Sequence, residues 1–144
     1  KNYTKTKIRI ARLHSKIRNS RKHNIINIVN DIVKDNDIIV SENLNVKGMS
    51  KNHNLAKSII DASFNMICNM LKWKTTIQGK YYYQVDTFYP SSKTCSRCGT
   101  KTDITNNLSI RKWTCENCGN ENDRDINASI NIMFEGLKLY YKTI

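Results

Sequence analysis

The chain has 144 residues, the size of one ordinary domain with a modest single core. Its 24 Lys and Arg residues against 12 Asp and Glu residues give a net charge of +12, which predicts an anionic partner, nucleic acid first. No stretch approaches the roughly 18–20 apolar residues of a membrane span, and the start carries no apolar signal segment. We therefore expect a cytoplasmic protein with no membrane partner, and its cysteine content argues for metal binding rather than disulfides, although Cys68 is expected to be a buried apolar residue.

The first predicted element is one long helix, or two helices end to end, over residues 3–34. Its apolar residues recur at helical spacing on either side of a polar break: Ile10, Leu13, Ile17, Ile25, Ile28 and Ile32. No acidic residue precedes Asp31, whereas basic residues crowd the same segment. A solvated basic face is the ordinary explanation, but a helix without any compensating acid favours phosphate contact. The residues that we predict to bind nucleic acid are Lys5, Arg9, Arg12, Lys16, Arg18, Arg21 and Lys22.

Two short runs of β-branched or aromatic residues predict strands. Residues 37–44, "DIIVSENL", suit a buried strand that carries Glu42 at its carboxyl end. Residues 80–90, "KYYYQVDTFYP", predict a second strand. The helical segment between them indicates a parallel pair joined by a right-handed crossover, in an α/β layer arrangement. Two strands make too small a sheet to be stable alone, so we expect further strands from elsewhere in the protein or from a partner.

Two more helices follow from the spacing of apolar residues. After a loop over residues 45–54, in which Gly48 is a breaker, we expect a helix over residues 54–73. A final helix should run from Asp125 to about Tyr140. Its predicted apolar side consists of Ile126, Ile130, Met133 and Leu137.

Two CxxC pairs are the most specific signal in the sequence. "CSRC" holds Cys95 and Cys98, and "CENC" holds Cys115 and Cys118. Two thiolates three residues apart grip a metal from a tight turn, and two such turns complete a tetrahedron of sulfur around Zn²⁺. The residues between the pairs would supply the hairpin of a zinc ribbon. A thioredoxin-like redox pair needs only one CxxC, and an iron–sulfur cluster is the lesser alternative for four thiolates.

Two acidic residues lie where a parallel α/β sheet gathers ligands. Glu42 is at the carboxyl end of a predicted strand, and a helix packed across the sheet would bring Asp125 to the same edge. Carboxylates that converge from separate elements favour a hard divalent ion, Mg²⁺ or Mn²⁺, and a two-metal site of this kind cleaves phosphodiesters. Taken alone, Asp125 would be an N-terminal helix cap and Glu42 a polar residue leaving a strand for the surface.

Four motifs, in this order and spacing, resemble one family: "SENLNVKGM", "SSKTCSRCG", "WTCENCG" and "DRDINASINI". They are similar to the C-terminal half of TnpB/OrfB proteins, which small insertion sequences encode and which are relatives of the type V CRISPR effector nucleases. The resemblance implies a partial RNase H-like (RuvC) nuclease fold with an inserted four-cysteine zinc ribbon, its first strands missing from this chain. The implied parts are a partial nuclease core over residues 1–90, the ribbon over 91–121 and the last nuclease helix over 122–144.

The resemblance also implies a role for individual residues. It places the catalytic, Mg²⁺- or Mn²⁺-binding carboxylates at Glu42 and Asp125, and it leaves Asp123 as a neighbour that shapes the helix entry. It places the structural zinc ligands at Cys95, Cys98, Cys115 and Cys118.

The implied activity is RNA-guided, metal-dependent cleavage of DNA, with DNA and a guide RNA as partners and no small-molecule substrate. The family's first catalytic aspartate lies upstream of the basic helix, and no acid before Asp31 replaces it here. We therefore expect a C-terminal fragment of such an endonuclease or transposase accessory protein, inactive alone. Two alternatives stay open: a stand-alone zinc-ribbon nucleic-acid-binding protein from a decayed transposon, and a DDE-type transposase, which would not explain where the ribbon lies.

Overall fold

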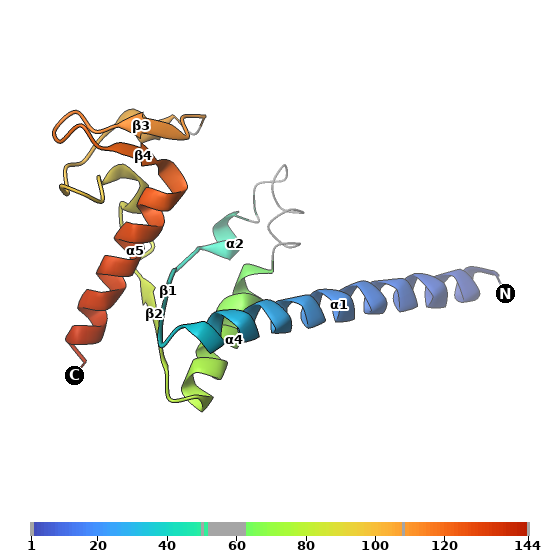
Figure 1. The fold of residues 1–144 in the computed structure, drawn as a ribbon. Coiled ribbons are helices and arrows are strands. Elements are labelled where there is room, and N and C mark those ends of the chain that lie inside the picture. Colours follow the sequence, from blue (N-terminus) through green and yellow to red (C-terminus); the bar gives the residue numbers. More distant parts are fainter. Residues whose placement is uncertain (1, 50, 52–62, 108, 144) are drawn as a thin grey trace.

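The computed structural model describes residues 2–49, 51, 63–107 and 109–143, and Figure 1 shows their arrangement. Helix α5 lies on one side of the strand pair β1–β2, and α1 and α4 lie on the other. No described helix combines the length and apolar composition that a bilayer crossing needs. In chain order the elements are α1 (Asn2–Asp35), β1 (Ile38–Glu42), α2 (Val46–Met49), α4 (Phe64–Ile77), β2 (Tyr81–Val85), the 3₁₀ turns η1 (Ser91–Lys93) and η2 (Ile104–Asn106), β3 (Lys112–Thr114), β4 (Glu121–Asp123) and α5 (Arg124–Tyr141).

The two strands β1 and β2 pair in parallel, as predicted, and Glu42 at the end of β1 lies opposite Val85 at the end of β2. Strand β2 is shorter than the predicted 80–90. It ends at Val85 because the Asp86 carboxylate accepts a hydrogen bond of 2.7 Å from the Phe88 amide, which turns the chain out of the sheet. The carboxyl ends of both strands therefore open at one edge of the molecule.

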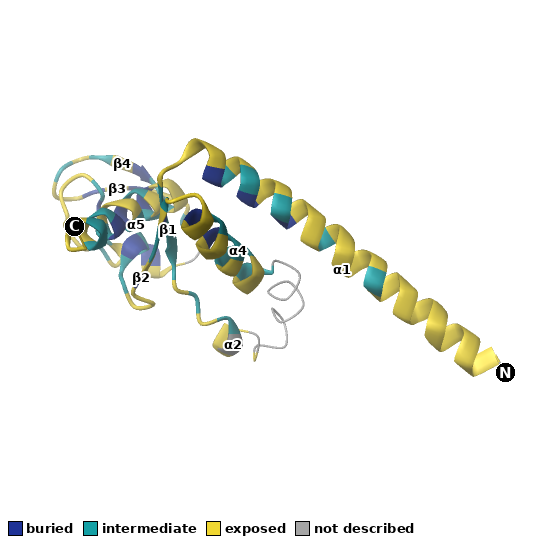
Figure 2. Cartoon of the chain, turned by 90° about the horizontal axis from the view of Figure 1, so that it is seen from below, coloured by how far each residue is buried: buried dark blue, intermediate teal, exposed yellow. Residues whose placement is uncertain are grey.

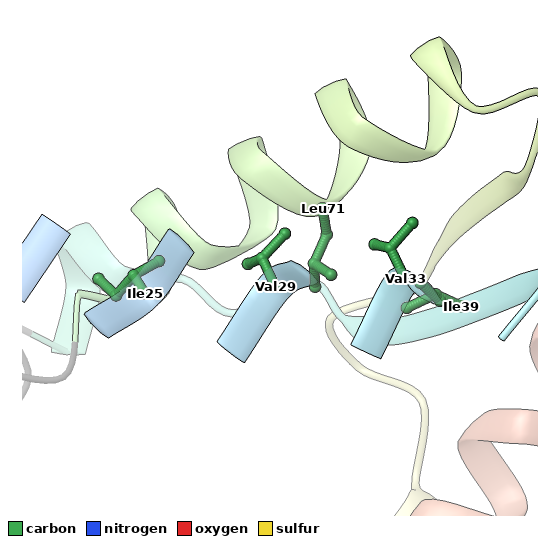
Figure 3. Packing of buried hydrophobic residues seen from close by; sticks show 5 residues of the cluster. All are labelled: Ile25, Val29, Val33, Ile39 and Leu71. Carbon is green, nitrogen blue, oxygen red and sulfur yellow. The ribbon is translucent and has the colours of Figure 1, made fainter. Parts of the chain in front are cut away.

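Alternate residues of β1 face opposite layers, because successive side chains of a strand point to opposite sides. Ile39 joins the core between β1, α1 and α4, and Figure 3 shows the packing of that core. Val40 faces the other way, against Gly136 of α5. The buried residues of the core are Ile25, Val29, Val33, Ile39 and Leu71.

Helix α1 is a single helix, uninterrupted because residues 2–35 contain neither glycine nor proline. The predicted apolar stripe is buried only near the C-terminal end of the helix. Ile10, Leu13 and Ile17 are 50%, 53% and 49% exposed, and Figure 2 shows this half of α1 extending away from the other elements. The sequence pattern identified an apolar face, but over the N-terminal half of α1 no other element in the described ranges packs against it.

The predicted loop over residues 45–54 is wrong in part, because it contains the short helix α2. The Asn45 side chain accepts a hydrogen bond of 2.9 Å from the Gly48 amide, which caps the first turn. Residues 52–54 of this loop and residues 54–62 of the helix predicted over 54–73 lie outside the described residues. The described part, α4, continues to Ile77, four residues beyond the predicted end.

Helix α5 begins and ends within one residue of the prediction, but its buried side is a different one. Ile126 and Met133 are 62% and 45% exposed, whereas Asn127, Asn131 and Gly136 are buried. A Cβ atom at Gly136 would lie 2.8 Å from Val40 Cβ, closer than real atoms approach. The helix therefore packs onto the sheet through a glycine and onto the chain at residues 91–96 through two asparagines.

Candidate functional site

Each CxxC pair closes the same tight turn. The amide of Gly99 donates to the carbonyl of Cys95, and the amide of Gly119 donates to the carbonyl of Cys115, both at 2.8 Å. The two glycines have φ values of +77° and +69°, a conformation that costs an L residue with a side chain about 1–2 kcal/mol. The repeat of one turn in two places explains why a glycine follows the second cysteine of each pair.

The four sulfur atoms lie together. All four Sγ atoms are within 4.8 Å of one another, with Cys95 and Cys118 3.8 Å apart and Cys98 and Cys115 3.7 Å apart. A tetrahedron with Zn–S bonds of about 2.3 Å has S···S edges of about 3.8 Å. The predicted convergence of the four cysteines is confirmed, and their spacing fits one zinc ion.

The electrostatics of the cluster differ from thiol to thiol. Hydrogen bonds from the side chain and backbone of Thr100, and from Asn117, lower the pKa of Cys98 to about 5. At Cys118 the Asn120 amide lowers the pKa, but desolvation and the three neighbouring cysteines outweigh it and raise the pKa to about 12. The low pKa of Cys98 favours its thiolate even without a metal, and binding of a divalent metal would release the protons still held in the cluster.

Little besides the cysteines holds the ribbon together. Its buried cluster consists of Cys95, Cys115 and Trp113, and Trp113 lies on β3. Strand β3 pairs antiparallel with β4, so the hairpin encloses the second CxxC pair rather than lying wholly between the pairs as predicted. The Asn122 side chain of β4 donates to Cys95 Sγ at 3.9 Å. Because this apolar cluster is small, a metal held by the four cysteines would supply much of the stability of the ribbon.

Glu42 is the last residue of β1 and is half-buried. Its Oε1 accepts a hydrogen bond of 2.9 Å from the hydroxyl of Ser91, which is itself only 5% exposed. Because Glu42 follows Val40 by two positions, it leaves the strand on the face that α5 covers. Ser91 was not predicted, since its contact with Glu42 spans 49 residues of chain and no local pattern reveals it.

Two buried asparagines of α5 hold the segment that carries Ser91. Asn131 Nδ2 donates to the carbonyls of Ser91 and Thr94 at 2.8 and 2.7 Å, and Asn127 Nδ2 also donates to Thr94 at 2.7 Å. Asn127 Oδ1 accepts from the amide of Ser96 at 2.8 Å. We name these two side chains the asparagine clamp. Their i, i+4 spacing in "INASIN" is the signal that the sequence offers, but it is a weak one because asparagine is usually a surface residue.

Asp125 is the second residue of α5. The Asp123 carboxylate caps the helix by accepting from the amides of Asp125 and Ile126 at 3.0 and 3.2 Å, so it shapes the helix entry as expected. The Asp125 side chain is 78% exposed and lies 3.4 Å from Arg111 Nη1. An exposed ion pair of this kind contributes roughly 0–1 kcal/mol, so Asp125 can exchange Arg111 for another cation at little cost.

The positions of Asp125 on α5 and of Glu42 on β1 can be compared through the faces of these two elements. Asp125 and Gly136 are eleven residues apart, about three turns, so they share one face of α5. That face packs on Val40, and Glu42 leaves β1 on the same side. Asp125 thus shares a helix face with Gly136, but its side chain is exposed and pairs with Arg111, whereas the half-buried Glu42 pairs with Ser91. Among the described residues, the four cysteines form the only group of three or more potential metal ligands.

The predicted nucleic-acid-binding residues all lie on α1. Four of them recur at i, i+4, i+7 and i+11 and so share one helix face, which we name the basic stripe: Lys5, Arg9, Arg12 and Lys16. All four are exposed, as are Arg18 and Lys22, whereas Arg21 is half-buried. The stripe lies on the half of α1 that extends away from the other elements (Figure 2).

Two family models match the chain in succession. A model described as "Probable transposase" matches residues 1–53, and one described as "Cas12f1-like, TNB domain" matches residues 64–132. A Streptomyces pristinaespiralis protein named as an RNA-guided DNA endonuclease is 36% identical over 136 residues, covering 94% of this chain and 33% of the relative. Escherichia coli K12 InsQ, also named as an RNA-guided DNA endonuclease, is 31% identical over 150 residues, covering 94% of this chain and 37% of InsQ.

The chain thus spans about a third of the length of the curated relatives it matches. A chain in the cryo-EM structure of a Cas12f1–sgRNA–target DNA complex has the same fold over 85% of this chain and 36% of its own length. The TM-score is 0.62 and the sequence identity 23%. The two family models and the relatives show that the chain belongs to the TnpB/OrfB family.

Proposed function

We propose that this chain is the C-terminal portion of a TnpB-type RNA-guided DNA endonuclease. In it Glu42 and Asp125 hold the catalytic Mg²⁺ or Mn²⁺, and the four clustered cysteines hold a structural zinc ion. The observation that carries the proposal is that β1 ends on a half-buried acid held by Ser91, while the helix that packs on β1, α5, has an acid in its first turn. The names of the relatives support the activity.

The proposed architecture is a partial RuvC-like nuclease core over residues 1–90, a zinc ribbon over 91–121 and the last nuclease helix over 122–144. The parallel pair β1–β2, with helices on both faces, supports this assignment. A two-stranded sheet is too small to stand alone, so the remaining strands would come from outside these 144 residues. A third metal-binding carboxylate would come with those strands. The family's first catalytic aspartate lies upstream of the basic helix, and no residue before Asp31 in this chain is acidic.

In the proposed cleavage of a phosphodiester, the bound ions and the side chains of this chain have different roles. Divalent ions at a paired site activate a water and stabilise the leaving oxygen of a phosphodiester. Glu42 contributes a carboxylate held by the Ser91 hydroxyl, so one oxygen is oriented and the other is left for a ligand. Asp125 contributes a carboxylate on a helix turn fixed by the Asp123 cap.

The zinc ribbon would act as a positioning element for this site. Cys95 directly follows Thr94, and the asparagine clamp ties Thr94 and Ser91 to α5. Ser91 in turn holds Glu42. Folding of the first cysteine turn therefore orders the segment on which the orientation of Glu42 depends.

A stand-alone zinc-ribbon nucleic-acid-binding protein is the second candidate. It is favoured by the fact that, within the described residues, only the cysteines form a complete set of metal ligands. The two candidates differ at Glu42. Metal-dependent DNA cleavage by a protein of the relatives' full length that carries this segment should depend on Glu42 if the nuclease proposal holds, and cleavage indifferent to Glu42→Ala would refute it.

The basic stripe is expected to bind phosphates in either case. Replacing Arg9, Arg12 and Lys16 with glutamine should flatten the slope of log Kd against log salt concentration. The expected change is about 0.9 for each phosphate that is no longer neutralised on B-DNA, or about 0.7 on a single strand. The measurement is fluorescence anisotropy of labelled DNA and RNA over a salt series.

The matched control removes positive charge elsewhere. Lys112→Gln and Lys142→Gln change exposed lysines on β3 and just after α5, outside the basic stripe. They should leave the slope nearly unchanged. Equal effects from both sets would mean that binding follows net charge alone and that α1 has no specific role.

A further inference from the structure

A hollow of about 410 Å³ opens at the carboxyl ends of β1 and β2, and Asn43, the residue after Glu42, lines it. Its volume falls within the roughly 300–1,000 Å³ of typical ligand pockets. No charged side chain lines it, although the chain as a whole carries a charge of +12. Its polar and aromatic lining residues are Asn43, Asn45, Asn65, Thr87 and Phe88.

Phe88 is the most exposed large apolar residue in the described chain, at 90%. Its backbone is nevertheless held in place. The Phe88 amide donates to Asp86 Oδ1 at 2.7 Å, the Tyr89 amide donates to the Asp86 carbonyl at 3.1 Å, and the Thr87 hydroxyl donates to the Asn43 carbonyl at 2.8 Å. These bonds tie the turn that carries Phe88 to the ends of both strands. The ring is therefore presented to solvent at a defined place, as a stacking platform requires.

The chemistry of the hollow suits a nucleobase. Bases stack on aromatic rings whatever their sequence, and only an unpaired, unstacked base offers its face to a side chain. Each asparagine carboxamide carries both hydrogen-bond donors and an acceptor, the complement that base edges require. A neutral hollow on a basic protein accepts a neutral base while the phosphates on either side remain attracted to the surrounding positive charge.

We propose that this hollow is a subsite for one unpaired nucleobase of single-stranded DNA, with the Phe88 ring as its stacking platform. The subsite rests on the proposed function, because it would place a base at the end of β1, where the proposed metal ligand Glu42 lies. It would hold the strand in register with the cleavage site without reading its sequence.

The test uses the 144-residue chain and single-stranded DNA that contains 2-aminopurine, without added divalent metal. Phe88→Ala should weaken binding by about tenfold and abolish the stacking-dependent quenching of 2-aminopurine, with the salt slope unchanged because no charge is lost. Phe88→Trp should keep both signals. Phe88→Leu keeps apolar bulk but lacks a π face, so it should behave like Phe88→Ala. Duplex DNA should bind all four proteins alike.

Tyr141→Ala is the matched control, because Tyr141 is a 69% exposed aromatic residue at the far end of α5 from Asp125. It should leave both signals unchanged. The subsite is overturned if Phe88→Ala binds single-stranded DNA like the unaltered chain, if Tyr141→Ala loses as much, or if duplex binding falls equally. A stronger effect of Phe88→Ala on single-stranded RNA than on DNA would also overturn the assignment to DNA.

A Glu42→Ala variant separates this subsite from the nuclease proposal. It should keep full affinity for single-stranded DNA and full quenching, because stacking on Phe88 needs no metal. If Phe88→Ala has no effect on binding or quenching while cleavage depends on Glu42, the subsite is refuted and the nuclease proposal is retained. If cleavage does not depend on Glu42 but Phe88→Ala still weakens binding, the nuclease proposal is refuted and the hollow is retained as a base-binding surface.

Discussion

Replacing Cys115 with serine should abolish stoichiometric zinc binding and unfold the ribbon. Cys115 is buried, and its Sγ lies 3.7 Å from that of Cys98, so its loss leaves the metal three sulfur ligands. Structural zinc sites in small domains contribute about 10–16 kcal/mol of apparent binding free energy at neutral pH. The buried hydrophobic cluster of the ribbon consists of Cys95, Cys115 and Trp113, so little apolar packing remains without the metal. Metal content and the near-ultraviolet circular dichroism of Trp113 measure the two effects.

The control for this substitution is Cys68→Ser, which changes the cysteine that lies on α4, outside the cluster. It should keep one metal per chain. Cobalt substitution gives a further check, since four thiolates around Co²⁺ absorb differently from an iron–sulfur cluster. An unchanged metal content in Cys115→Ser would contradict the four-ligand site.

Replacing Glu42 or Asp125 with alanine should abolish metal-dependent DNA cleavage by a protein of the relatives' full length that carries this segment. Each change removes a proposed ligand of the catalytic ions. Ser91→Ala should have an intermediate effect and lower the cleavage rate about 10–100-fold. Ser91 holds a proposed metal ligand by a hydrogen bond, and loss of such a partner typically lowers activity by that factor. A higher Mn²⁺ concentration should recover part of the activity of Ser91→Ala and none of that of Glu42→Ala.

Ser92→Ala is the control, since Ser92 neighbours Ser91 in sequence but the hydroxyl that holds Glu42 is that of Ser91. It should leave cleavage unchanged. The 144-residue chain itself is expected not to nick plasmid DNA with Mg²⁺ or Mn²⁺, because two carboxylates hold the ions poorly. Nicking by this chain that disappears in Glu42→Ala would show that the site is complete without a third acid.

Features that depend on neighbours in sequence were predictable. The extent of α1 followed from apolar residues at helical spacing, although two helices end to end remained possible, and the parallel pair followed from two β-branched or aromatic runs around a helix. The cysteine turns followed from CxxC spacing and from Gly99 and Gly119. In each case the residues that determine the conformation lie within a few positions of one another.

Features that depend on contacts across the chain were not predictable from one sequence. The side of α5 that packs was predicted from its isoleucines, but a glycine and two asparagines form it, because Val40 and the carbonyls at residues 91 and 94 are the actual partners. The hydrogen bond between Ser91 and Glu42 joins two segments that are 49 residues apart, and no sequence pattern links them. Hydrophobic patterning identifies apolar faces, but it does not show which buried carbonyls require an amide donor.

Paramagnetic broadening of the amide NMR signals of this chain by Mn²⁺ tests the shared carboxylate site most directly. Titration with Mn²⁺ should broaden the signals around Glu42 and Asp125 together, with one midpoint, while the zinc ribbon stays folded. Either Glu42→Ala or Asp125→Ala should weaken both effects at once. Broadening at one carboxylate without the other, or with separate midpoints that respond only to the local substitution, would show that the two acids do not hold ions in common.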